Sequence, residues 1–206
     1  MTIVHLARHG ETVWHAENRY AGSSDVGLTE LGRAQAETLG RWAAGTRPVA
    51  VYSSDLSRAR ITATPAASVL GLDLNIDARL REVDFGRGEG LTTAEMREQF
   101  PEELAEFHRH PGLSPLPGGE SGLEAVARAW AALEQIATRH EPGPVLVVMH
   151  STLMRLVLCR VLDMPLDRYR SAFPSVVNAA ITTVSLGSNP PALHAYNVTQ
   201  FPGAEP

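Results

Sequence analysis

The sequence contains no lysine, and all 18 of its basic residues are arginine. An arginine at any one position is therefore weak evidence of function by itself. A single cysteine, Cys159, excludes an internal disulfide, and its apolar, helix-like surroundings predict a small buried side chain rather than a nucleophile. No stretch approaches the roughly 20 apolar residues of a transmembrane helix. Residues 1–3 do not begin a basic region followed by a long apolar run, as a signal peptide would, so we expect a cytoplasmic protein.

The net charge of −5 leaves little positive charge to spread over a surface. Broad binding to nucleic acid or to an anionic membrane needs a basic face, so we expect neither partner. The 206 residues are enough for one domain with a full core. Because 44% of them are apolar and 20% are charged, we expect a globular chain. The sequence leaves homodimer formation open.

Short apolar segments alternate with segments of helical periodicity along the chain. Strands are predicted at residues 3–7, 48–52, 72–76, 145–149, 180–186 and 192–198, and helices at 29–45, 56–70, 92–107, 121–140 and 152–162. The strands are apolar throughout, which is typical of a mostly parallel sheet with helices on both faces. The last two strands would form a hairpin around Asn189-Pro190.

Two prolines fall inside predicted helices. Pro65 predicts a kink or a restart within residues 56–70, and Pro101 predicts that residues 92–107 form two short helices. Residues 111–119 contain three prolines and three glycines, which predicts a loop.

Two histidines directly follow predicted strands. His9 follows the first strand and His150 follows the strand at 145–149. The carboxyl ends of parallel strands meet at one edge of a sheet, where ligands bind. Arg8 precedes His9, and Arg58 begins the helix after another strand, so all four side chains are expected at that edge. Two arginines and two histidines suit a phosphoryl group, which is highly charged and rich in acceptor oxygens.

One of these histidines could act as a nucleophile, since histidine forms covalent intermediates. Neighbouring arginines would help by lowering its pKa and keeping a ring nitrogen unprotonated. The leaving alkoxide then needs a proton, which a carboxylic acid in the irregular segment 79–90 could supply. Glu82, Asp84 and Glu89 are the candidates there, and the residues alone leave the choice among them open.

Six segments, in this order, resemble the histidine phosphatase superfamily, in its phosphoglycerate mutase-like branch. They are Leu6-Ala7-Arg8-His9-Gly10-Glu11-Thr12, Leu28-Thr29-Glu30-Leu31-Gly32, Ser53-Ser54-Asp55-Leu56-Ser57-Arg58-Ala59, Leu80-Arg81-Glu82-Val83-Asp84-Phe85-Gly86, Pro117-Gly118-Gly119-Glu120-Ser121 and Val148-Met149-His150. Arg-His-Gly alone is a weak motif, but six segments in order are specific. The resemblance implies a single domain over residues 1–206, with a three-layer α/β/α fold and a small helical lid inserted at about 87–120.

The resemblance also implies roles for individual residues. His9 would be the nucleophile that forms a phosphohistidine, and Glu82 would be the proton donor, which settles the choice among the three carboxylates. Arg8, Arg58 and His150 would hold the phosphoryl group and stabilise its transition state. The resemblance also implies that His15, Gly22 and Ser151 bind the substrate. No metal and no cofactor are expected, and the expected partner is a small phosphorylated molecule.

Three positions depart from the family pattern. His15 replaces a common asparagine, and it could still donate a hydrogen bond to phosphate with a charge that depends on pH. Ser151 replaces a glycine after the second histidine, which puts the tightness of that turn in doubt. Gly88 stands where many relatives have tryptophan, which predicts a more open pocket wall.

Three functions are compatible with the resemblance. A phosphatase would transfer the phosphoryl group to water, and a phosphoglycerate mutase would return it to the product. The mutases of the family carry Tyr-Gly and a lysine in the segment matching 85–95, and serine or threonine at the position of Ala21. This chain lacks all of these, so hydrolysis is favoured. A non-catalytic phospho-ligand-binding protein is the third alternative. Substrate specificity is expected in the lid and in the loop 12–27.

Overall fold

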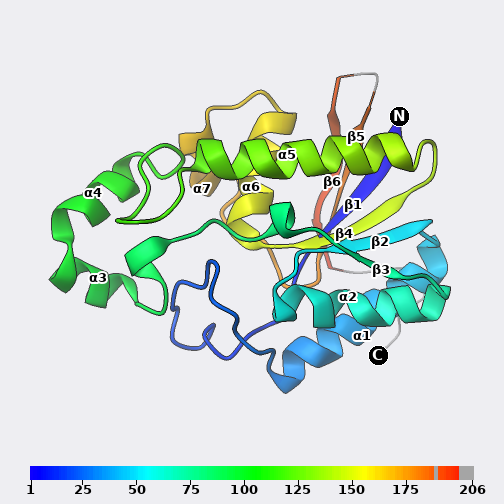
Figure 1. Cartoon of the computed structure of the whole chain (residues 1–206), viewed down its shortest axis with the longest axis horizontal. Coiled ribbons are helices and arrows are strands. Elements are labelled where there is room, and N and C mark those ends of the chain that lie inside the picture. The colour runs from blue at the N-terminus through cyan, green and yellow to red at the C-terminus, as the bar shows by residue number, and fades with distance from the viewer. Residues whose placement is uncertain (188–189, 200–206) are drawn as a thin grey trace.

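A six-stranded sheet with strand order β3-β2-β4-β1-β5-β6 forms the centre of the molecule. The computed structural model describes residues 1–187 and 190–199, and helices cover both faces of the sheet (Figure 1). In chain order the strands and α-helices are β1 (Thr2–Arg8), α1 (Glu30–Thr46), β2 (Ala50–Ser53), α2 (Ser57–Leu70), β3 (Leu74–Ile76), α3 (Thr93–Gln99), α4 (Pro101–Arg109), α5 (Gly122–Arg139), β4 (Val145–Met149), α6 (Ser151–Val161), α7 (Tyr169–Ala172), β5 (Ile181–Leu186) and β6 (Ala192–Val198). The predicted three-layer α/β/α architecture is confirmed.

The sheet is mostly parallel, as the sequence predicts. β4 lies between β1 and β2, and β3 pairs with β2, all in parallel. β5 is antiparallel to β1, and β6 is antiparallel to β5, so β6 runs in the same direction as the first four. The two late strands do pair as predicted, although Asn189 of the predicted turn lies outside the described residues.

β4 shows why the strands are apolar throughout. Val147 and Met149 join a core with α5 and α6, whereas Leu146 and Val148 join a second core with α1 and α2. All four side chains are fully buried. Because successive side chains of a strand point to opposite faces, a strand covered on both faces must be apolar at every position.

The helices begin where the sequence predicts. The Thr29 side chain accepts a hydrogen bond from the Gly32 N–H at the start of α1. Ser121 and Glu124 form a reciprocal capping box at the start of α5. Such caps satisfy backbone donors that have no partner inside the helix, and each is worth about 0.5–2 kcal/mol.

The two helix prolines have different outcomes. Pro101 is the first residue of α4, where the missing N–H costs nothing, so the predicted break is confirmed. Pro65 lies inside α2, and that helix continues without interruption, so of the two predicted outcomes the restart does not occur, and the kink stays a prediction. At Gly40 of α1 an added Cβ would come within 3.0 Å of the Pro65 Cβ. Close packing of α1 against α2 therefore supports the helix across its proline.

The short helices α3 and α4 lie at one end of the molecule, at the left of Figure 1, away from α1 and α2. No helix in the described ranges is long and apolar enough to cross a membrane.

Candidate active site

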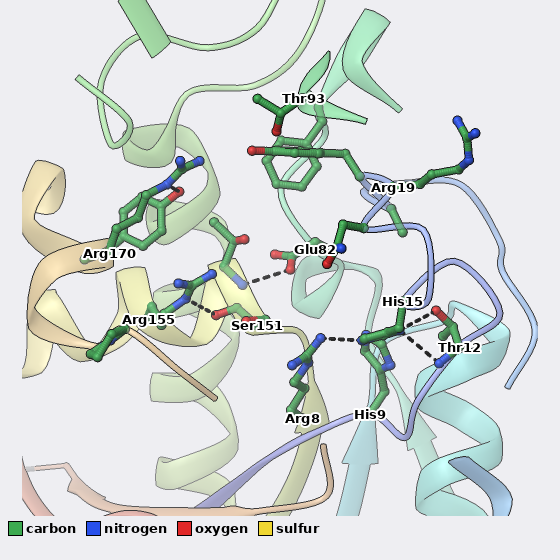
Figure 2. Close-up of a pocket in the computed structure, with 17 residues that line it drawn as sticks. Arg8, His9, Thr12, His15, Arg19, Glu82, Thr93, Ser151, Arg155 and Arg170 are labelled. Carbon is green, nitrogen blue, oxygen red and sulfur yellow. Dashed lines mark hydrogen bonds between the residues drawn. The ribbon is translucent and has the colours of Figure 1, made fainter. Parts of the chain in front are cut away.

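The carboxyl ends of β1 and β4 open into a pocket of about 490 Å³ (Figure 2). His9 comes from the end of β1, Ser151 from the start of α6 after β4, and Glu82 from the segment between β3 and α3. The sequence predicts this edge of the sheet as the site. Of the predicted residues, Arg8, His9, His15, Glu82 and Ser151 line the pocket, whereas Arg58, His150 and Gly22 are not among its lining residues.

A close backbone approach shapes the turn after β1. A Cβ added at Gly10 would lie 2.4 Å from the Gly32 carbonyl oxygen, and one at Gly32 would lie 2.1 Å from the Glu11 carbonyl oxygen. Only glycine fits at both positions, which lets α1 pack directly against the turn. The Gly10 N–H also donates to the Thr62 Oγ1 at 2.9 Å. The histidine turn is therefore fixed by backbone contacts on two sides.

His9 is held in an orientation suited to nucleophilic attack. Its side chain is 6% exposed, and its Nδ1 lies 2.7 Å from the Gly10 carbonyl oxygen. A carbonyl only accepts, so Nδ1 carries the proton and Nε2 keeps its lone pair. Burial, together with the charges of Arg58 and Arg8, holds the pKa of His9 well below its usual range. The ring therefore stays neutral and nucleophilic at neutral pH.

His150 lies beside His9, with the two ring centroids 5.1 Å apart. It is fully buried, and its Nε2 lies 2.7 Å from the Ser54 Oγ. Burial and the nearby Arg58 charge also hold the pKa of His150 well below its usual range. The Ser54 hydroxyl can donate to Nε2 or accept from it. In the tautomer in which it donates, the proton of a neutral His150 lies on Nδ1, which is then a donor.

Arg58 is fully buried, and its guanidinium is held by loop carbonyls. Nη1 donates to the Ser24 carbonyl oxygen at 2.6 Å, and Nη2 donates to the carbonyl oxygens of Gly22 at 2.7 Å and Ala21 at 3.0 Å. Glu89 holds this loop, because its carboxylate accepts the backbone N–H groups and hydroxyls of Ser23 and Ser24. Loop 21–24 thus positions an arginine 34 residues further along the chain.

Arg8 is oriented by two contacts in the pocket wall. Nη1 donates to the Val176 carbonyl oxygen at 2.6 Å, and Nη2 donates to the His15 Nε2. Burial lowers the pKa of Arg8 to about 10, and the nearby Glu82 charge partly opposes that effect. The guanidinium therefore remains a cation at neutral pH.

His15 faces arginine in this structure. Its Nδ1 lies 2.7 Å from the Thr12 Oγ1, and its Nε2 faces the Arg8 Nη2. A guanidinium only donates toward Nε2, and the Thr12 backbone N–H donates to Nδ1 at 3.0 Å, so both ring nitrogens of His15 face donors. Burial and the Arg8 charge lower the pKa of His15, which agrees with a neutral ring. His15 supports Arg8 and also lines the pocket, and its expected donation to phosphate stays a prediction.

Glu82 is fixed at the start of α6. Its Oε2 accepts from the Thr152 N–H at 2.8 Å, and its Oε1 accepts from the N–H groups of Leu153 at 2.8 Å and Val83 at 2.9 Å. The first turn of a helix offers free N–H groups and a positive dipole end, which together suit a carboxyl group. Glu82 is 6% exposed and lines the pocket, and it lies between Arg8 and Thr93 in Figure 2.

The other two candidate acids have structural partners. Asp84 accepts the Gly86 N–H at 2.8 Å, and Glu89 holds loop 21–24. Of the three carboxylates that the sequence leaves open, Glu82 is the one that lines the pocket.

Several buried donors at the site have no protein partner. Among the described residues, the buried side-chain N and O atoms without a hydrogen bond are Nε of Arg8, Nε of Arg58, Nδ1 of His150 and Oγ of Ser185. The first three surround His9. Buried polar groups are normally hydrogen-bonded. With the His150 proton on Nδ1, all three atoms are donors suited to an anionic ligand.

The family departures have local explanations. Ser151 is the first residue of α6 and adopts ordinary helical backbone, so no glycine is needed there. The prediction of a more open wall at Gly88 is wrong, because Leu116 and Met96 fill the space. A Cβ at Gly88 would lie 2.5 Å from the Leu116 Cδ1 and 3.0 Å from the Met96 Sδ. Gly22 is not among the residues that line the pocket, and its carbonyl oxygen accepts a hydrogen bond from Arg58.

The structure adds residues that the sequence reading missed. Asn178 donates to the His9 carbonyl oxygen at 2.8 Å, and Arg19, Arg155 and Arg170 line the pocket. Arg155 could have been found, because it lies one helical turn after Ser151 and so shares its face of α6. Arg170 and Asn178 lie in irregular segments or at short helices, where no periodicity indicates which way they point.

Burial raises the pKa of the Cys159 thiol to about 11, in agreement with the predicted structural role of this residue. Within residues 1–187 and 190–199, no group of three or more His, Cys, Asp or Glu side chains is arranged to hold a metal ion.

A family model described as the histidine phosphatase superfamily, branch 1, matches residues 4–199. This chain belongs to the histidine phosphatase superfamily. The sequence resemblance is thereby confirmed. Phosphoserine phosphatase 1 of Hydrogenobacter thermophilus is 32% identical over 81% of this chain and 79% of its own length. The metal-independent phosphoserine phosphatase of Arabidopsis thaliana is 35% identical over 90% of this chain and 77% of its own length.

Solved structures show the same fold. Bacillus stearothermophilus YhfR superposes with a TM-score of 0.91 at 31% identity, covering 97% of this chain and 98% of that one. A mycobacterial glucosyl-3-phosphoglycerate phosphatase superposes with a TM-score of 0.85 at 27% identity, covering 96% and 99%. Because the chain belongs to this family and its similar relatives include named phosphatases, we conclude that it is a phosphatase.

Proposed function

We propose that the chain hydrolyses small phosphomonoesters through a phosphohistidine formed on His9. The observation that carries this proposal is the fixed tautomer of His9. Its Nδ1–H donates to the Gly10 carbonyl, so the Nε2 lone pair is free. The unpartnered donors of Arg8, Arg58 and His150 surround that ring and are suited to bind the phosphoryl oxygens.

In the first step the His9 Nε2 attacks phosphorus while the ester P–O bond breaks. The leaving alkoxide takes a proton from the Glu82 carboxyl group. Oε2 is suited to carry this proton, because it accepts one backbone N–H whereas Oε1 accepts two. Arg8, Arg58 and the His150 Nδ1–H offset the charge that spreads over the phosphoryl oxygens in the transition state.

In the second step water attacks phosphorus and the N–P bond breaks. The Glu82 carboxylate takes the proton from this water, which returns Glu82 to its acid form. Inorganic phosphate leaves, and His9 is neutral again with its proton still on Nδ1. General acid and base catalysis by one group contributes roughly 10²–10⁴-fold to the rate.

The proposal includes features around the site. We infer that residues 87–120 form a lid within a single domain, since Thr93 at the start of α3 lines the pocket. Arg170 also stacks on Phe107 of α4, at 4.7 Å from its ring centroid. A cytoplasmic location is part of the same proposal, supported by the single, buried Cys159. Homodimer formation is tested by light scattering of the purified chain.

The test is turnover of p-nitrophenyl phosphate and a panel of phosphorylated sugars and acids in the presence of EDTA. Quenching the reaction on ³²P-labelled substrate should give an acid-labile, alkali-stable label on wild-type protein and none on His9→Ala. No turnover of any substrate, or a His9→Ala protein that behaves like wild type, would refute the proposal.

A phosphoglycerate mutase remains the second candidate. A probable phosphoglycerate mutase of Salmonella paratyphi C is 34% identical over 80% of this chain and 77% of its own length. Conversion of 3-phosphoglycerate to 2-phosphoglycerate faster than release of phosphate would favour this function. We expect hydrolysis to be faster, because the Tyr-Gly and lysine of the mutases are missing from residues 85–95.

A further inference from the structure

Three arginines line the pocket beyond those assigned to the phosphoryl group. They are Arg19, Arg155 and Arg170 (Figure 2). They differ in whether a carboxylate of the protein already neutralises them, and that difference indicates which of them are available to a substrate.

Arg19 is neutralised by the protein. Its Nε lies 2.7 Å from the Glu17 carboxylate, and its Nη1 lies 2.8 Å from the Glu95 carboxylate. Nη1 also donates to the Gly90 carbonyl oxygen. This arginine links loop 12–27 to the start of α3, and its charge is already balanced.

Arg155 and Arg170 have no such partner. Within the described ranges, neither forms an ion pair with a carboxylate. The Arg155 Nε donates to the Ser151 carbonyl oxygen at 3.2 Å, and the Arg170 Nε donates to the Tyr169 hydroxyl at 2.9 Å. The Arg170 side chain also hydrogen-bonds to Tyr20. All of these partners are neutral oxygens, so neither guanidinium charge is balanced, and each group has further N–H donors for an anion.

Aromatic rings fix both guanidinium groups. Each stacks on Tyr169, with its central carbon 5.1 Å from the ring centroid for Arg155 and 5.5 Å for Arg170. Arg170 also stacks on Phe107. Stacking covers the flat faces and holds the side chains in place, so little conformational entropy remains to be lost when a ligand binds.

These two cations lie within reach of a substrate bound at His9. Arg155 is close enough to Arg8 for its charge to contribute to lowering the pKa of Arg8. In Figure 2 both arginines project into the pocket from the wall opposite His15 and Thr12. The pocket volume of about 490 Å³ leaves room for a substrate much larger than phosphate itself.

We propose that Arg155 and Arg170 form a second anion subsite that binds a carboxylate or a further phosphate on the same substrate molecule. This inference rests on the proposed function and narrows it to phosphomonoesters with a second negative charge. Two adjacent, fixed guanidinium groups without a counter-charge favour an anion, and arginine binds both groups through paired, charge-assisted hydrogen bonds.

The test compares kcat/KM for substrates that differ by one group. 3-Phosphoglycerate and glycerol 3-phosphate differ in a carboxylate, and fructose 1,6-bisphosphate and fructose 1-phosphate differ in a phosphate. We expect wild-type protein to prefer the more anionic member of at least one pair by about 10–100-fold, the range for a charge-assisted contact. The pair that shows the preference identifies the bound group.

The variants are Arg170→Gln and Arg155→Gln, each of which should reduce that preference about tenfold or more. A ratio of two substrates on one preparation does not depend on the fraction of folded protein. Arg168→Gln is the matched control, because Arg168 is exposed and lies outside the pocket lining, and it should keep the wild-type ratio.

Two negative results have different meanings. If wild-type protein turns over none of these substrates and no p-nitrophenyl phosphate, the proposed function itself fails. If it hydrolyses both members of each pair with equal kcat/KM, or if the two variants keep the wild-type ratio, phosphatase activity stands and the second anion subsite is wrong.

Discussion

As the pH is lowered, the free energy of unfolding should begin to decrease at a higher pH than titration of the carboxylates alone would give, because His9 and His150 are buried as neutral rings. Both have pKa values held well below 6.5, first by burial and then by the Arg58 charge. In the unfolded chain they titrate near pH 6.5. Below that pH the unfolded state therefore binds more protons than the folded state, and the free energy of unfolding decreases as the pH falls.

As long as both rings stay neutral in the folded protein, the size of this decrease depends only on the pKa of histidine in the unfolded chain. Between about pH 6.5 and about pH 5.5, each such histidine removes about 1 kcal/mol from the free energy of unfolding, so the pair removes about 2 kcal/mol. For a chain of this length, 1 kcal/mol corresponds to roughly 2–4 °C in Tm. The pair should therefore account for a decrease of roughly 4–8 °C in Tm.

Urea unfolding at the two pH values measures this effect. His9→Gln and His150→Gln should each lose about 1 kcal/mol of the pH-dependent change, because the titrating group is gone. His194→Gln, which changes an exposed residue of β6, is the control and should keep the full change. Comparing each variant with itself at two pH values removes the effect of the substitution on stability at a single pH.

The reasoning is refuted if both variants show the same change between the two pH values as wild type. The histidines would then titrate alike in the folded and unfolded states. A neutral His9 would no longer be guaranteed below pH 6.5, and kcat/KM should then decrease steeply there.

Four further outcomes are expected. Glu82→Gln should lower kcat for glycerol 3-phosphate by roughly 10²–10⁴-fold and for p-nitrophenyl phosphate by much less, because nitrophenolate leaves without a proton. Gly88→Leu should cost about 1–3 kcal/mol in urea unfolding because Leu116 fills the space, whereas Gly27→Ala in open space should change stability by less than about 0.5 kcal/mol. Glu89→Ala should cost about 1.5–3 kcal/mol and raise KM, because it releases the loop that holds Arg58. EDTA should leave kcat unchanged, and a loss of activity restored by a divalent cation would contradict the metal-independent mechanism.

The sequence predicted much of the site because its key residues follow strands. The position of His9 and His150 after buried apolar strands, together with the rule that parallel strands end at one edge, was enough to bring them together. The N-caps of α1 at Thr29 and of α5 at Ser121 could also be predicted, since a cap is a local pattern of a few residues.

The predictions that failed depended on contacts between segments distant in the chain. Pro65 does not restart α2, because α1 packs against it through Gly40. Gly88 does not open the pocket, because Leu116 occupies the space from 28 residues further along. Local sequence carries no information about which distant side chain fills a gap.

The sequence by itself determined the family and the fold class, and it predicted the residues of the candidate site, because ordered motifs and strand periodicity are properties of the chain. Only the tertiary structure decided what each charged side chain faces. Arg19 is paired with Glu95 across 76 residues, whereas Arg155 and Arg170 lack a carboxylate partner among the described residues. Nothing in the sequence separates these three arginines. The presence or absence of a carboxylate partner separates Arg19, which joins two segments of the protein, from the two arginines of the candidate subsite.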